Sequence, residues 1–194
     1  MDRLSTLSIV IALAGCEGTP GGEAAPGRAN VAKVSASTGA STEAFCDVHF
    51  AADKGPAFVL PALVDGTLPP TTTGWRWINV WATWCKPCVE EMPRLVGWRD
   101  KLAASGKPFE LAFVSVDENA TDIAAYRKEH PQAPTSPRLA ETAKQADWFT
   151  AVGLDANAPI PVHIFVGPEG HVRCARVGGI RERDYAAIAK LLTE

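Results

Sequence analysis

The sequence predicts an α/β domain in which helices flank a central mixed β-sheet. Residues 109–117 form a nearly continuous apolar run, which is typical of a buried strand in a parallel pair. Residues 75–81 form a second apolar strand, and it leads directly into a helix predicted over residues 85–104. Residues 161–177 contain two strands separated by a Gly-Pro-Glu-Gly turn, so the second strand is predicted to return beside the first.

Shorter elements complete this pattern. Two short strands, over residues 58–60 and 63–64, lie near the turn signal Asp65-Gly66 and predict an N-terminal hairpin. The remaining predicted elements are helices over residues 119–130, 139–152 and 185–192.

Cys85 and Cys88 lie where the strand over 75–81 is followed by a helix. Two cysteines at this spacing can form a disulfide within one turn. The free N–H groups and the positive end of the helix dipole favour a thiolate there, and the thiolate is the form that attacks disulfides. The motif therefore predicts thiol–disulfide exchange, with Cys85 as the exposed nucleophile and Cys88 as the shielded cysteine that resolves the mixed disulfide.

The residues around this pair resemble the active site of thioredoxin-fold oxidoreductases, and most closely the TlpA/ResA-like envelope branch. The matching stretch is residues 78–93, Ile-Asn-Val-Trp-Ala-Thr-Trp-Cys-Lys-Pro-Cys-Val-Glu-Glu-Met-Pro. Thioredoxins proper usually carry a buried aspartate where this chain has Asn79, which favours the envelope branch. The resemblance covers residues 55–194. It implies the thioredoxin fold, with the helix over 119–130 as the helical insertion of this branch.

The resemblance also implies roles for residues near the pair. Glu91 matches an acidic residue that raises the pKa of a cysteine or relays protons. The alternative is a solvated glutamate in the first turn of the helix. Pro161, preceded by Ile160, matches a cis-proline that lies beside the two cysteines, where neighbouring backbone pairs with the substrate. The usual Thr-Thr after this proline is replaced by Val162 and His163, so fine substrate contacts are expected to differ. His163 itself is expected at the surface or in packing.

Besides Ile160, four residues are predicted to support the active site. Asn79 is expected beneath it on the central strand, where a buried amide needs hydrogen-bond partners. Trp84 is the best candidate for a flat docking surface. Lys86 adds a positive charge that either favours the thiolate or is merely solvated, and Pro87 restricts the loop between the cysteines.

The N-terminal region is predicted to lie outside the folded domain. Its apolar run ends in Leu-Ala-Gly-Cys at residues 13–16, which resembles a lipobox, so residues 1–15 are predicted to be a lipoprotein signal peptide and Cys16 to carry lipid. An ordinary signal peptide or a wrongly assigned start is the alternative. Residues 16–44 contain no aromatic residue and few aliphatic ones, so they predict a flexible linker. The folded domain is predicted over residues 45–194.

Cysteine parity predicts a further disulfide. The chain has five cysteines. With Cys16 lipidated and one redox pair set aside, Cys46 and Cys174 remain, and an oxidising compartment favours their pairing. Two independent thiols are the alternative. Cys46 and His49 have a spacing found in metal sites, but the other ligands of a zinc site are not visible, so no metal and no cofactor is predicted.

Composition and resemblance together limit the function. The net charge is −3 and no cluster of Lys or Arg occurs, which excludes a nucleic-acid-binding surface. The resemblance implies a thiol:disulfide oxidoreductase of the bacterial envelope, facing the periplasm or the exterior. It would reduce protein disulfides, for example in cytochrome c maturation. The implied partners are disulfide-bearing envelope proteins such as apocytochrome c, an upstream membrane thiol donor, and the membrane itself through the lipid. A disulfide oxidant or isomerase and a metal-binding thioredoxin-like module are the alternatives.

Overall fold

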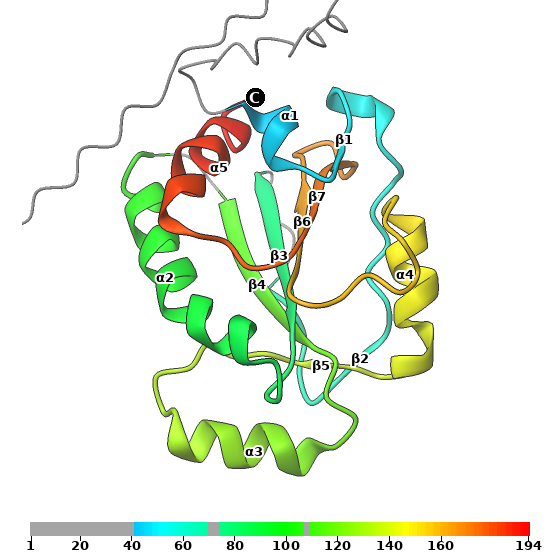
Figure 1. Cartoon of the computed structure of the whole chain (residues 1–194), viewed down its shortest axis with the longest axis vertical. Coiled ribbons are helices and arrows are strands. Elements are labelled where there is room, and N and C mark those ends of the chain that lie inside the picture. The colour runs from blue at the N-terminus through cyan, green and yellow to red at the C-terminus, as the bar shows by residue number, and fades with distance from the viewer. Residues whose placement is uncertain (1–40, 70–73, 107–108) are drawn as a thin grey trace, which may run out of the picture. The chain divides into compact units, whose positions relative to one another are not determined.

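A mixed sheet of seven strands forms the centre of the part that the computed structural model describes, residues 41–69, 74–106 and 109–194 (Figure 1). The strand order is β1-β7-β6-β3-β4-β5-β2. Strand β3 pairs in parallel with β4 and antiparallel with β6, so the predicted mixed sheet is confirmed. The strands are β1 Val48–His49, β2 Leu63–Val64, β3 Trp75–Trp81, β4 Phe109–Ser115, β5 Arg138–Leu139, β6 Val162–Val166 and β7 Val172–Val177.

Helices cover both faces of this sheet. Helices α2 and α5 lie on one face, α4 lies on the other, and α3 connects β4 with β5 (Figure 1). The helices are α1 Thr42–Phe45, α2 Lys86–Ala103, α3 Ala120–Glu129, α4 Gln145–Ala151 and α5 Tyr185–Leu191, with short 3₁₀ turns at Ala52–Lys54, Thr142–Lys144 and Glu182–Asp184. Within the described ranges, no helix combines the length and the apolar character that a membrane crossing requires.

Burial explains the apolar runs in the sequence. Every residue of β3 and of β6 is buried, because helices cover both faces of these central strands. Trp77 of β3 stacks on Phe165 of β6, with ring centroids 5.0 Å apart. Asn79 and His163 are direct partners in the same register, so two polar side chains lie opposite each other in the apolar centre.

The predicted N-terminal hairpin is wrong. Residues Leu63 and Val64 pair with β5 at one edge of the sheet, and β1 pairs with β7 at the opposite edge. Ala57 forms only an isolated bridge with His171. Pro61 lies between the two predicted strands and has no N–H to donate to a ladder, so the local turn signal could not produce a hairpin.

The helix predicted over residues 139–152 is shorter than expected. Arg138 and Leu139 form β5, which the sequence did not predict, and the α-helix begins only at Gln145. Strand β5 pairs with β2 on one side and with β4 on the other. Two residues carry too little periodicity to predict a strand, so only the neighbouring strands define it.

The folded domain begins earlier than predicted, because the last residues of the predicted linker form α1. Ser41 accepts a hydrogen bond from the backbone of this helix, and Thr42 Oγ1 donates to Glu194 at 3.2 Å. Phe45 packs edge-on against Phe165, with centroids 5.9 Å apart. Residues 1–40, with the predicted signal peptide, the lipidation site and most of the linker, lie outside the described residues.

Cys46 and Cys174 form a disulfide, with Cα atoms 5.6 Å apart. This distance lies within the usual range for bridged cysteines. Cys174 belongs to β7 and is wholly buried, whereas Cys46 ends α1. The bond therefore attaches the segment that enters the domain to the sheet, and the sulfur of Cys46 is not a free ligand beside His49.

Candidate functional site

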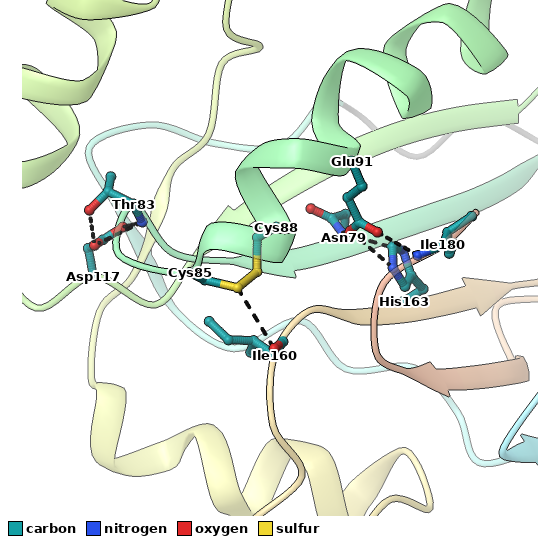
Figure 2. Close-up of a disulfide and its surroundings, with 9 residues drawn as sticks. All are labelled: Asn79, Thr83, Cys85, Cys88, Glu91, Asp117, Ile160, His163 and Ile180. Atoms are coloured by element: carbon teal, nitrogen blue, oxygen red, sulfur yellow. Dashed lines mark hydrogen bonds and ion pairs between the residues drawn. A yellow bond between two sulfur atoms is a disulfide. The ribbon is translucent and has the colours of Figure 1, made fainter. Parts of the chain in front are cut away.

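The Cys85–Cys88 disulfide lies at the point where β3 is followed by α2, with Cα atoms 5.3 Å apart (Figure 2). Cys85 is the N-cap residue of α2 and Cys88 lies in its first turn. Cys85 is 5% exposed and Cys88 is fully buried. The predicted order of exposure holds, but the expectation of an openly exposed Cys85 is wrong for this disulfide form.

The loop that carries Pro161 covers Cys85. The Ile160–Pro161 peptide bond is cis, and the carbonyl oxygen of Ile160 lies 3.8 Å from Cys85 Sγ (Figure 2). The structure thus brings together residues that lie 75 positions apart in the sequence. This is the arrangement that the family resemblance implied, and it leaves the backbone before the proline next to the reactive sulfur.

Asp117 holds the loop that precedes the cysteines, a role that the sequence reasoning missed. Its carboxylate accepts the Thr83 N–H at 3.0 Å and the Thr83 hydroxyl at 2.7 Å (Figure 2). It also accepts the Ser115 hydroxyl at 2.6 Å. Asp117 is wholly buried. The available signal was topological, since parallel strands β3 and β4 end at the same edge and bring their following residues together.

Glu91 is buried next to the redox pair, so the solvated alternative is wrong. Only 2% of Glu91 is exposed. Its Oε1 accepts a hydrogen bond from Asn79 Nδ2 at 3.0 Å and lies 3.2 Å from His163 Nε2 (Figure 2). Its Oε2 accepts the backbone N–H of Ile180 at 2.7 Å. Burial of a carboxylate is costly unless such donors surround it.

His163 is part of this cluster, although the sequence placed it at the surface or in packing. The side chain has no exposed area, and Trp77 Nε1 donates to its Nδ1 at 3.2 Å. Asn79 therefore has the buried supporting position that was predicted, with an unpredicted histidine as its cross-strand neighbour. The strand pairing alone could have revealed this contact, and pairing is not visible in one sequence.

Trp84 is an exposed aromatic side chain next to Cys85. It is 69% exposed and lines a shallow hollow together with Tyr126 of α3. Burial raises the pKa of Tyr126 above its usual value of 10.0, so its hydroxyl stays protonated and faces Met92 Sδ at 3.9 Å. An exposed aromatic side chain beside the reactive cysteine suits docking of another chain.

Lys86 and Pro87 occupy the two positions between the cysteines. Lys86 Nζ lies 3.7 Å from Glu90 Oε1 in an ion pair that is open to solvent. Exposed ion pairs of this kind contribute little to stability, so the interpretation of Lys86 as a solvated side chain fits best. Pro87 lies in the first turn of α2, where its missing N–H leaves no helical bond unmade. Among the residues that the structure describes, no group of three or more His, Cys, Asp or Glu side chains could hold a metal.

Comparison with known proteins shows the family to which the chain belongs. The model of the AhpC/TSA family matches residues 51–175, well over half of the chain. The chain is 27% identical over 118 residues to the thiol-disulfide oxidoreductase ResA of Bacillus subtilis (strain 168), a match covering 58% of this chain and 60% of ResA. It is 25% identical over 95 residues to ResA of Bacillus thuringiensis (strain Al Hakam), covering 49% and 50%. The chain thus spans half to three fifths of the length of these relatives.

Solved structures confirm the fold. A thiol:disulfide interchange protein of the thioredoxin family from Chlorobium tepidum TLS aligns with a TM-score of 0.51 at 23% identity, covering 74% of this chain and 100% of that one. StoA from Bacillus subtilis aligns with a TM-score of 0.51 at 17% identity, covering 72% and 100%. The chain belongs to the AhpC/TSA family and has the thioredoxin fold, with its Cys85–Cys88 disulfide at the start of α2.

Proposed function

We propose that this protein is a thiol:disulfide oxidoreductase that reduces protein disulfides by cycling Cys85 and Cys88 between dithiol and disulfide. The observation that carries the proposal is the Cys85–Cys88 disulfide at a helix N-terminus, covered by the Ile160–Pro161 loop. The names of the ResA relatives support the same chemistry.

The cycle begins with the reduced pair. The Cys85 thiolate attacks one sulfur of a client disulfide, forms a mixed disulfide and releases the other client sulfur as a thiolate, which takes up a proton. The Cys88 thiol then loses its proton and attacks Cys85 Sγ, so the Cys85–Cys88 bond forms and the second client sulfur leaves. Two electrons pass to the client, and the redox pair is oxidised.

Groups near the two cysteines assist different steps of this cycle. The N-terminus of α2 favours the Cys85 thiolate, since the first-turn N–H groups lack helical partners. Trp84 gives the client an exposed aromatic contact, and the backbone at Ile160 lies beside the reacting sulfur. Glu91 follows Cys88 by three residues on α2, about one turn further on, and is the buried carboxylate on this part of the helix, so it would serve as the proton acceptor for Cys88.

We further propose that the protein acts in the bacterial envelope, held to a membrane by lipid on Cys16 after removal of residues 1–15. The lipobox-like residues 13–16 support the anchor, and a structural disulfide at Cys46–Cys174 suits an oxidising compartment. The clients would be disulfide-bearing envelope proteins such as apocytochrome c, and a membrane thiol donor would restore the dithiol.

Mass spectrometry of the N-terminus tests the anchor. The protein isolated from a bacterial membrane fraction is expected to begin at Cys16 and to carry the mass of acyl chains. Cys16→Ala should leave the precursor unprocessed, because the modified thiol is absent. Detection of Met1 or of an unmodified Cys16 in the mature protein contradicts the anchor without affecting the redox proposal.

The reduction potential of the redox pair tests the direction of electron flow. We expect a potential nearer to the roughly −270 mV of thioredoxin than to the roughly −120 mV of DsbA. The measurement equilibrates the protein with glutathione buffers of known ratio and counts the Cys85–Cys88 peptide in each state, so the second disulfide does not contribute. A potential at the DsbA end would favour the oxidant alternative.

A further inference from the structure

Trp84 lies in a turn whose two sides are held by different parts of the protein. On one side, Cys85 donates its backbone N–H to the Ala82 carbonyl at 3.1 Å, and its own carbonyl accepts an N–H of α2 at 3.1 Å. On the other side, Thr83 donates two hydrogen bonds to Asp117. The Trp84 side chain is 69% exposed, so packing around its ring contributes little to its position. The orientation of Trp84 therefore depends on how Thr83 is held.

Asp117 binds both the backbone and the side chain of Thr83. Its Oδ2 accepts the Thr83 N–H at 3.0 Å, and its Oδ1 accepts the Thr83 hydroxyl at 2.7 Å (Figure 2). The Ser115 hydroxyl donates to Oδ2 at 2.6 Å and accepts the Asp117 N–H at 2.9 Å, which fixes the carboxyl group in turn. Burying a carboxyl group is costly unless donors surround it, and here every such donor also fixes its orientation.

Arg138 of β5 holds the backbone that carries Asp117. Its Nη1 donates to the Asp117 carbonyl at 3.1 Å and to the Glu118 carbonyl at 2.7 Å. Its Nε donates to Asp65 Oδ2 at 2.6 Å. The Arg138 side chain is 13% exposed. Because a guanidinium group is planar and presents its donors in a fixed geometry, these three acceptors are held in one arrangement.

The backbone of Asp65 agrees with a constrained network. Its φ is 63°, a left-handed conformation that is uncommon for residues other than glycine. Such conformations persist where the surrounding contacts hold them, and they gather at functional sites. Asp65 directly follows β2, which pairs with β5, so its ion pair with Arg138 connects the turn after β2 to the backbone at Asp117. The Asp65-Gly66 turn forms no hairpin, and this network gives it another role.

We propose that Asp117 and Arg138 are positioning residues that fix Trp84 for docking of a client protein, acting through Thr83. Arg138 fixes the backbone at Asp117, the Asp117 carboxyl group fixes Thr83, and Thr83 fixes the residue that follows it. A contact that is ordered before binding loses less conformational entropy when the partner binds. This inference rests on the proposed function and names residues that control how the client is bound. The bonds made and broken in the exchange are those of the cycle above.

Two substitutions of Thr83 separate its hydroxyl bond from its shape. Thr83→Val keeps the branched shape but removes the hydroxyl that donates to Asp117. Asp117 Oδ1 then still has the Thr83 N–H at 3.2 Å, so no buried oxygen is left without a donor. Thr83→Ser keeps the hydroxyl and should restore the contact. Arg138→Lys keeps the positive charge, but a single ammonium group cannot replace the guanidinium at all three acceptors.

The measurement compares a protein client with a small disulfide. Each reduced variant is mixed with insulin or with hydroxyethyl disulfide, quenched with acid, and the oxidised Cys85–Cys88 peptide is counted by mass spectrometry over time. With insulin, we expect Trp84→Ala to slow the reaction about tenfold, and Thr83→Val and Arg138→Lys to slow it about three- to tenfold. Thr83→Ser should stay within about twofold. With hydroxyethyl disulfide, which is too small to need the indole, all four variants should stay within about twofold, because α2 holds Cys85 separately.

A double variant distinguishes positioning from a general loss of structure. If Thr83 acts through Trp84, Thr83→Val should change the insulin rate by less than about twofold once Trp84 is replaced by alanine. An equal loss with and without Trp84 would overturn the proposal. So would insulin rates that Thr83→Val and Arg138→Lys leave unchanged, a loss in Thr83→Ser as large as in Thr83→Val, or equal losses with the two disulfides. A wild-type protein that reacts with neither disulfide would contradict the proposed function itself.

Discussion

Replacing Cys85 with serine is expected to reduce insulin-disulfide reduction to the rate of the dithiothreitol background. A serine hydroxyl does not ionise at neutral pH, so the attacking thiolate is lost. The variant should still fold, because Cys85 is the N-cap of α2 and serine is among the preferred N-cap residues. The loss can therefore be assigned to chemistry. The measurement is the turbidity of the precipitating insulin B chain.

Cys88→Ser is the matched control for this experiment. It keeps the attacking thiolate but removes the thiol that resolves the mixed disulfide, so turnover should stop after one attack. The first attack itself should proceed at close to the wild-type rate. Normal turnover by Cys85→Ser would contradict the assignment of Cys85 as the nucleophile.

The second large effect concerns stability. Removing the Cys46–Cys174 disulfide by double substitution to alanine is expected to lower the free energy of unfolding by about 4–5 kcal/mol. The two residues are separated by 128 positions, so their bond greatly restricts the unfolded chain. The measurement is urea unfolding without reductant. The slope of the free energy of unfolding against urea concentration is compared between the variant and the wild type.

The redox pair provides the control for this loss. Cys85 and Cys88 are separated by only 3 positions, so replacing both with alanine removes a bond that closes a much smaller loop. Its effect on the free energy of unfolding should be clearly smaller than that of the Cys46/Cys174 double variant. Equal losses in the two double variants would mean that loop closure is not the origin of the stabilisation.

Local patterns predicted the central elements of the fold well. The apolar run over residues 75–81 and the following helix were assigned correctly, because continuous burial and helical periodicity are both local properties. The helix over 119–130 and the strand pair within 161–177 were likewise correct. The hairpin near residues 58–64 was wrong, because its turn signal could not reveal that β2 pairs with β5.

The candidate site was predictable only where its residues are close in sequence. Cys85, Cys88 and Glu91 lie within one motif, and the resemblance supplied Pro161. Asp117 was missed, and the contacts of His163 beside Glu91 were not predicted, because both arise from strands that the fold brings next to the motif. The burial of Glu91 also could not be predicted from the neighbouring sequence, because Glu91 is covered by the loop that contains Ile180, 89 positions further along the chain.

The central claim is that Cys85 alone forms the covalent bond with the client. It is tested most directly by incubating Cys88→Ser protein with a disulfide-linked peptide and mapping the trapped adduct by mass spectrometry after non-reducing digestion. One adduct is expected, with the peptide bonded to Cys85 and the Cys46–Cys174 disulfide intact. An adduct on Cys46 or Cys174, or no adduct at all, would contradict it.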